Sequence, residues 1–387
     1  MSDERETTNG RQSADLAVLG AGVIGLSCAW RAAQAGLDVI VLDGGSRERA
    51  SEVAAGMIAP VGEALWGEDA LLAASLASAE AWPGFAAGLE EASGIAVTYR
   101  RCGSIHVGLD RDEVAELRRH HDLHDELGLE ARWLRGSECR SLEPGLATEV
   151  AGGFEAPGEA EVDPRAMLDA LRVACVAAGV RIEAASATEI QIEGGAVSGV
   201  ALSEGPAVAA PRVLAATGAR LGGAPLPEDA RPPVRPVKGE VVRLRARPGE
   251  RPCERIVASE RVYVVPRAGG EVVVGATVED RGFDLRVTAG GIFELLREAY
   301  RALPEIAELE LVECSAGLRP ATPDNAPVIG VTSVEGLLLA GGHHRNGILL
   351  APVTAEAIGA MLAGREAPES VRALDPGRFA RAAGAAR

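Results

Sequence analysis

The sequence has few aromatic residues, which make up only 3% of its 387 positions. Alanine, valine, leucine and glycine must therefore supply most of the buried surface. Lysine is nearly absent too, because Lys238 is the only one and the other permanently charged basic residues are arginines. Acidic residues outnumber Lys and Arg by 56 to 39, which gives a net charge of −17. A chain with this charge repels a phosphate backbone, so no nucleic-acid partner is expected.

Long apolar runs are also missing. No run approaches the roughly 18 residues of a membrane-spanning helix, so no integral membrane contact is expected. The segment 1–13 has no apolar signal core and indicates a disordered tail, which leaves the cytoplasm as the expected location. The six cysteines form no CxxC pair and no metal-ligand spacing, which predicts free thiols and no metal site.

The length predicts two domains. Buried-strand patterns that run into glycines recur near the start, in the middle and near the end, whereas 234–279 has an all-strand pattern. We therefore predict an α/β plus α+β fold, in which an antiparallel-sheet substrate-binding domain is inserted into a discontinuous Rossmann-type cofactor-binding domain. The expected cofactor-binding segments are 14–90, 150–225 and 320–370, and the expected substrate-binding segments are 91–149 and 226–319.

Sequence signals for helices lie between these strand patterns. Asp163 suits an N-cap and Pro164 the first turn of a helix that extends to about Gly179. Further helices are predicted over 68–92, 110–128, 289–302 and 353–362.

A dinucleotide-binding motif follows the first apolar run. Gly20-Ala21-Gly22-Val23-Ile24-Gly25 lies between a predicted strand and a predicted helix. Gly20 allows the tight turn, Gly22 lets the backbone approach a pyrophosphate, and Gly25 lets helix and strand pack closely. The helix N-terminus then presents N–H donors to the phosphates. Asp43 ends the second strand, where it is placed to accept hydrogen bonds from ribose hydroxyls. The motif alone does not separate FAD from NAD, but the later Rossmann-like strands favour FAD.

The order of several segments resembles a known family. These segments are GAGVIGLS, AAGMIAP (54–60), VLAATGA (213–219), RPVKGEVVRL (235–244), AGLRPATPDNAPVIG (316–330) and GGHHRNGILLAP (341–352). Together they resemble the D-amino-acid oxidase group of flavoenzymes, and within it the glycine oxidases of thiamine biosynthesis. The resemblance covers roughly residues 14–370. It implies non-covalent FAD and oxidation of glycine, sarcosine or small D-amino acids to the imine, with O2 reduced to H2O2. It also implies a homo-oligomer, often a tetramer.

The resemblance assigns roles to individual residues. Arg319 in the GLRP segment matches the arginine that pairs with the substrate carboxylate, Tyr263 matches the tyrosine that donates to the same group, and Arg345 matches a second pocket arginine. The residues that match cofactor contacts are Gly20, Gly22, Val23, Ile24, Gly25, Asp43, Ser51, Ala55, Gly56, Met57, Thr217, Gly218, His344, Arg345, Asn346, Gly347, Ile348 and Leu349.

Some positions depart from the family pattern. His344 replaces a usual aromatic residue, Arg261 replaces a frequent His, and Val278 stands where a bulkier Met can lie. Gly317 stands where covalent relatives carry the flavin-linking Cys, so no covalent link is expected. These departures leave the preferred substrate open. Two other functions also stay open: a FAD dehydrogenase that passes electrons to an acceptor other than O2, and a flavin-binding subunit without turnover.

Overall fold

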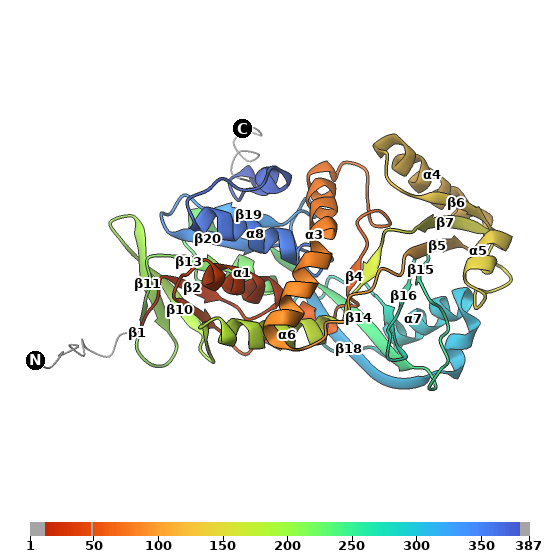
Figure 1. Cartoon of the computed structure of the whole chain (residues 1–387), viewed down its shortest axis with the longest axis horizontal. Coiled ribbons are helices and arrows are strands. Elements are labelled where there is room, and N and C mark those ends of the chain that lie inside the picture. Colours follow the sequence, from red (N-terminus) through yellow and green to blue (C-terminus); the bar gives the residue numbers. More distant parts are fainter. Residues whose placement is uncertain (1–11, 48, 380–387) are drawn as a thin grey trace, which may run out of the picture.

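The computed structural model describes residues 12–47 and 49–379 of the chain. Two large sheets lie in opposite halves of an elongated molecule, and the long strands β14 (Arg235–Arg245) and β18 (Glu310–Ala321) lie between the middle and one end (Figure 1). This mixed arrangement confirms the predicted fold class. Within the described ranges, no helix is long and apolar enough to cross a membrane.

The first sheet has six strands drawn from the start, middle and end of the chain. In spatial order they are β19 (Val328–Val331), β20 (Leu337–Gly341), β13 (Val213–Ala215), β2 (Leu16–Leu19), β3 (Val39–Leu42) and β9 (Arg181–Glu183). All neighbours are parallel except β19 and β20. β2, β3 and β13 are buried along their whole length, because helices or a further sheet cover both faces.

Helices from distant parts of the sequence pack on this sheet. They are α1 (Val23–Gln34), α3 (Asp69–Ser93), α6 (Pro164–Ala177) and α8 (Ala351–Leu362). The predicted cap of α6 is confirmed, because the Asp163 carboxylate accepts hydrogen bonds from the backbone N–H groups of Arg165 and Ala166. These interactions satisfy two donors that the first turn of a helix leaves without intrahelical partners.

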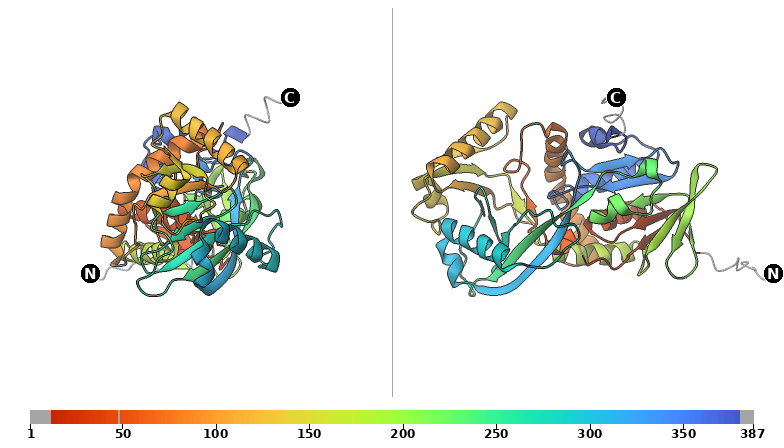
Figure 2. Two further views of the ribbon diagram at one scale, coloured as in Figure 1. Left: turned by 90° about the vertical axis from the view of Figure 1, so that its right-hand side faces the viewer. Right: turned by 180° about the vertical axis from the view of Figure 1, so that it is seen from behind.

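The second large sheet has eight strands. In spatial order they are β18, β14, β17 (Glu271–Gly275), β16 (Tyr263–Pro266), β15 (Ile256–Ala258), β5 (Ser104–Gly108), β7 (Gly152–Ala156) and β6 (Arg132–Arg135). Helices α4 (Arg111–Leu127), α5 (Gly136–Leu142) and α7 (Ala289–Ala302) lie around it (Figure 2). Leu295, Ala299 and Ala302 of α7 pack against its buried valines and leucines.

The strand β7 corrects one predicted boundary. The sequence analysis placed residues from 150 onward in the FAD-binding domain, but β7 pairs antiparallel with both β5 and β6 of the eight-stranded sheet. Nothing local in the segment distinguishes the two sheets, because the pairing partners lie elsewhere in the sequence. The rest of the domain division stays a prediction.

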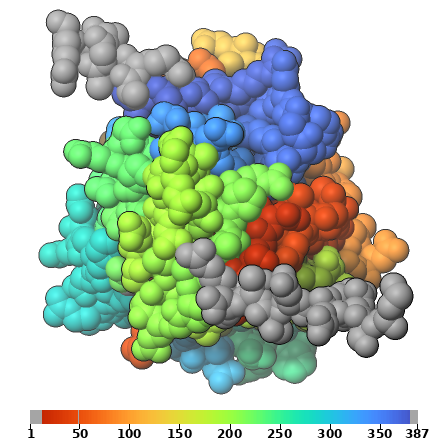
Figure 3. All heavy atoms as spheres, turned by 90° about the vertical axis from the view of Figure 1, so that its left-hand side faces the viewer, coloured from red at the N-terminus to blue at the C-terminus, as the bar shows by residue number. Residues whose placement is uncertain are grey.

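A four-stranded sheet lies at one end of the molecule, where its yellow-green hairpin is in front in Figure 3. It consists of β1 (Gln12–Ser13), β12 (Val208–Ala209), β11 (Ala196–Leu202) and β10 (Ala187–Glu193). Of the tail predicted over 1–13, residues 1–11 lie outside the described ranges. Gln12–Ser13 are a strand instead, because β12 offers its edge to them in parallel.

Short elements complete the described chain. They are α2 (Ala50–Val53), β4 (Met57–Ile58), β8 (Ala160–Glu161), and the 3-10 helices η1 (Gly218–Gly223), η2 (Glu228–Ala230), η3 (Pro304–Glu308) and η4 (Glu369–Leu374). β4 and β8 form a two-stranded antiparallel ribbon. In the chain, β4 follows the segment that carries Ser51 and precedes the loop that carries Glu63.

Candidate functional site

One cavity of about 1890 Å³ extends from the six-stranded sheet to the eight-stranded sheet. The glycine motif lines one end, and Tyr263 and Arg319 line the other. Pockets for drug-sized ligands measure roughly 300–1,000 Å³. The cavity is therefore large enough for a dinucleotide together with a small substrate.

The glycine motif forms a close junction of strand and helix. A side chain at Gly25 would overlap the carbonyl oxygen of Gly20, and a Cβ at Gly20 would lie 2.6 Å from the carbonyl oxygen of Ala216. At Gly22, by contrast, the nearest atom to a Cβ is the Ser51 Oγ, at 3.6 Å. The motif thus packs tightly on the protein side and leaves its middle glycine open toward the cavity, as a pyrophosphate site requires.

The predicted phosphate and ribose contacts lie around this junction. Ser51 accepts a hydrogen bond from the Val23 N–H, the first helical residue of α1, at 3.3 Å. Asp43 follows β3 and lines the cavity, where its Oδ1 accepts from the Gly45 N–H at 3.0 Å and pairs with Arg49. Asp43 thus follows the second strand, as predicted, and has a cationic neighbour that the sequence analysis did not assign. Its contact with the ribose stays a prediction.

The remaining wall at this end fits FAD. Thr217 follows β13, and its buried Oγ1 has no hydrogen-bond partner among the described residues, although it lies at the cavity wall. Gly56, between Ala55 and Met57, has a φ of 76°, and a side chain there would overlap the Val162 carbonyl oxygen. Gly218 begins η1, also with a positive φ. An unpaired buried hydroxyl is costly unless a ligand supplies its partner, so the wall fits a bound cofactor.

Arg319 and Tyr263 converge at the opposite end of the cavity. Arg319 lies on β18, and its Nη1 donates to the Thr277 carbonyl oxygen at 3.0 Å. Tyr263 begins β16, and burial raises the pKa of its hydroxyl, although the nearby Arg319 guanidinium partly offsets this rise. Arg319 and Tyr263 thus present a cation and a hydroxyl donor to the same space, which suits a carboxylate.

Two strand glycines make room for this pair. A Cβ at Gly239 of β14 would lie 2.6 Å from the Cζ of Arg319, and a Cβ at Gly275 of β17 would lie 2.5 Å from the Tyr263 hydroxyl. The guanidinium and the phenol therefore lie directly over glycine backbone. A glycine within a strand often marks such a close approach, so the sequence held this signal, but the sequence analysis did not use it.

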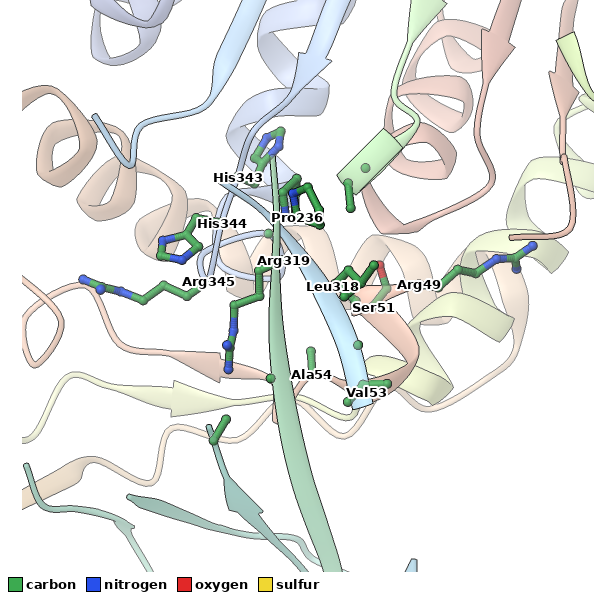
Figure 4. A pocket seen from close by; sticks show the side chains of 18 of the residues that line it. Arg49, Ser51, Val53, Ala54, Pro236, Leu318, Arg319, His343, His344 and Arg345 are labelled. Atoms are coloured by element: carbon green, nitrogen blue, oxygen red, sulfur yellow. The ribbon is translucent and has the colours of Figure 1, made fainter. Parts of the chain in front are cut away.

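Arg345 has a partner that was not predicted. Its Nε donates to the Glu63 carboxylate at 3.2 Å, and its Nη2 donates to the Glu63 carbonyl oxygen at 3.1 Å. In Figure 4 the Arg345 side chain points away from Arg319. Burial and then the nearby arginines lower the pKa of His344 to about 4, so its ring is neutral at neutral pH.

The run that was predicted to pass the flavin is only partly at the cavity. His344, Arg345, Gly347 and Ile348 line it, whereas Asn346 and Leu349 line a separate small recess. The Leu349 carbonyl oxygen instead accepts hydrogen bonds from Ser78 at 2.6 Å and Trp82 at 2.9 Å. These α3 donors hold the chain just before α8 begins, which turns this backbone away from the cavity.

Comparison with known proteins agrees with this geometry. The chain matches the family described as FAD dependent oxidoreductase (DAO) over residues 15–361. It is 34% identical to a glycine oxidase of Geobacillus kaustophilus over 350 residues, which cover 88% of this chain and 90% of that protein. The crystal structure of glycine oxidase from Geobacillus kaustophilus superposes with a TM-score of 0.88 at 30% identity, covering 95% of this chain and 99% of that one.

Longer relatives match as well. The bifunctional protein ThiO/ThiG of Trichormus variabilis is 34% identical over 352 residues, which cover 89% of this chain and 52% of that protein. The chain therefore spans about half the length of the bifunctional relatives it matches.

Proposed function

Because the chain belongs to the FAD-dependent oxidoreductase family, we propose that it oxidises glycine, and also sarcosine or small D-amino acids, to the corresponding imine or 2-oxo acid. One observation carries the proposal: a single cavity joins the glycine motif to a guanidinium and a phenol that suit a carboxylate. A relative named glycine oxidase, at 34% identity, supports the choice of substrate.

The residues at the far end of the cavity orient the substrate. The Arg319 guanidinium holds the carboxylate with parallel N–H bonds, and the Tyr263 hydroxyl donates a third. Bound FAD supplies the acceptor for the hydride that leaves the substrate carbon. Positioning that carbon is much of the rate enhancement, because two reactants held in register need no further alignment. The neutral His344 ring adds no positive charge that would repel the substrate amine.

The proposal extends to the electron acceptor and the role of the product. O2 takes the electrons and is reduced to H2O2, and the product serves the synthesis of the thiamine thiazole ring. The relatives named ThiO/ThiG support this role. We further propose a cytoplasmic homo-oligomer, as the sequence resemblance implies.

Anaerobic mixing of the flavin-loaded protein with glycine, sarcosine, D-alanine and D-proline tests the proposal. Glycine should bleach the visible flavin band, and admitting air should restore the band and release H2O2. Bleaching without H2O2 would mean that the protein is a dehydrogenase that uses an acceptor other than O2. If none of the four compounds bleaches the flavin, the proposed substrate class is wrong.

A further inference from the structure

Beyond the residues that hold the carboxylate, we propose that Glu63 is the proton acceptor for the substrate amino group. The proposal rests on the proposed function, because it concerns the same site and an amino-acid substrate. Such a substrate enters mainly as an ammonium ion, whereas release of a hydride from its carbon needs the nitrogen lone pair. The ammonium must therefore lose a proton. A base at the amine end of the cavity would accept this proton, which Arg319 and Tyr263 do not do.

Glu63 lies where such a base is needed. It lines the same cavity as Arg319 and Tyr263. The Arg319 guanidinium lowers the pKa of the Glu63 carboxyl, and the Glu63 carboxylate raises the pKa of the Tyr263 hydroxyl. The Glu63 side chain is 26% exposed and lines the cavity, whereas its neighbours Gly62 and Ala64 are buried. With Arg319 on the carboxylate side, the site then offers one cation and one anion to a zwitterion.

The backbone around Glu63 is held by side chains from other elements. The His124 ring bonds to the Val61 carbonyl oxygen at 2.9 Å, and the His120 ring bonds to the Ala64 carbonyl oxygen at 2.6 Å. The Gly62 N–H donates to the Glu159 carboxylate at 2.5 Å. These three polar anchors, at the two residues before Glu63 and the one after it, keep Glu63 in a defined position, as a group that receives a proton requires.

Several charged groups face Glu63 and decide its protonation. Burial raises the pKa of its carboxyl, whereas Arg345 and then Arg319 lower it, and Glu68 on the same loop raises it. Tyr263 and Glu159 are further titratable neighbours. A raised pKa makes a carboxylate a stronger proton acceptor, and the two arginines limit this rise.

The proton transfer is balanced within the site. One N–H bond of the substrate ammonium breaks, its electron pair stays on nitrogen, and a new O–H bond forms on a Glu63 carboxylate oxygen. No oxidant takes part in this step. After the oxidised product leaves, the proton passes from Glu63 to water in the cavity, which returns the carboxylate to its starting form.

The pH profile of anaerobic flavin reduction by glycine tests the role. In the wild type the reduction rate at saturating glycine should reach a plateau above the pKa of Glu63. The proton that leaves the amine stays in the complex on Glu63, so the pH of the solution does not change the fraction of bound glycine that has a neutral amine. Glu63→Gln keeps the shape and a hydrogen bond to Arg345, but it accepts no proton. Its rate should fall by about 100-fold at neutral pH and then rise with pH as free glycine amine accumulates.

Glu68→Gln is the matched control. Glu68 lies on the same loop, 3.9 Å from Arg345, and lines the small recess instead of the cavity. This variant should keep the wild-type plateau. Binding of glycolate, which has the carboxylate but no amine, should be no weaker in Glu63→Gln than in the wild type, because Arg319 and Tyr263 remain.

The outcomes separate the two proposals. If Glu63→Gln keeps a plateau, whether at the wild-type rate or uniformly slower, Glu63 is not the proton acceptor. If Glu63→Gln fails to retain FAD, Glu63→Asp answers the question, because it should keep the plateau at a lower rate; a rate that climbs with pH would contradict the role. If the wild type is not reduced by any amino acid, it is the proposed function that fails.

Discussion

Replacing Gly239 with alanine should damage catalysis while leaving the fold intact. The new Cβ would lie 2.6 Å from the Cζ of Arg319, and even closer to its nitrogens. Real atoms do not approach this closely, so the guanidinium must move. It can move, because it is the far end of a flexible side chain. The strand backbone of β14 therefore keeps its place, and the free energy of unfolding should change by less than about 1 kcal/mol.

The expected size of the catalytic loss follows from the hydrogen bonds involved. A hydrogen bond to a charged group contributes about 1.5–3 kcal/mol. If the displaced guanidinium loses one of its two bonds to the substrate carboxylate, the loss is about 2 kcal/mol. Since each 1.36 kcal/mol is a factor of about ten in rate, kcat/KM should fall roughly 30-fold.

Steady-state kinetics with glycine, together with denaturant unfolding, measures both quantities. Gly269→Ala is the matched control, because a Cβ at Gly269, in the turn between β16 and β17, meets no atom within 4 Å. The control should keep wild-type kcat/KM. The reasoning is refuted if Gly239→Ala also keeps wild-type kcat/KM, since Arg319 would then not need its observed position.

Three further changes test other parts of the structure. Gly25→Ala should reduce the flavin content of the purified protein at least about tenfold, because the new side chain would overlap the Gly20 carbonyl oxygen; Gly88→Ala, whose Cβ would meet only Trp30 at 3.8 Å, should keep full flavin content, and equal flavin content in both variants would contradict the close junction. Trp82→Phe should lower the free energy of unfolding by about 1–3 kcal/mol, because the buried Leu349 carbonyl oxygen would keep only Ser78 as donor; denaturant titration checks this, and an unchanged midpoint and slope would argue against it. Burial raises the pKa of Glu159 from 4.5 to about 7. A carboxyl whose pKa is raised by folding stabilises the fold fully below the unfolded pKa and loses that contribution as the pH rises through the folded pKa. The wild type should thus lose about 3 kcal/mol of unfolding free energy between pH 4.5 and about 7 relative to Glu159→Gln, and parallel pH curves for the two proteins would show that Glu159 does not carry this dependence.

The sequence predicted those parts of the fold that depend on local signals. The N-cap at Asp163 and the first turn at Pro164 are local chemistry, because a carboxylate reaches the N–H groups two and three residues ahead. The glycine motif likewise needs only its neighbouring strand and helix. The sheet membership of β7 was mistaken, because strand pairing depends on residues far along the chain.

The candidate site shows the same division. Arg319 and Tyr263 were named from their segments, and both line the cavity. Glu63 was missed, since its contact with Arg345 joins residues that are 282 positions apart. Gly239 and Gly275 did carry a usable signal, because a glycine in the interior of a strand pattern has no side chain to pack and often marks a close approach.

The order of strands in the six-stranded sheet has a consequence for the synthesis of the protein. β13, at the centre of the sheet, pairs with β2 from the start of the chain and with β20 near residue 340. A ribosome therefore must make nearly the whole chain before this sheet can close. Until then, β13 would expose an apolar strand edge, which favours aggregation. We expect the nascent chain to acquire flavin only after β20 has emerged.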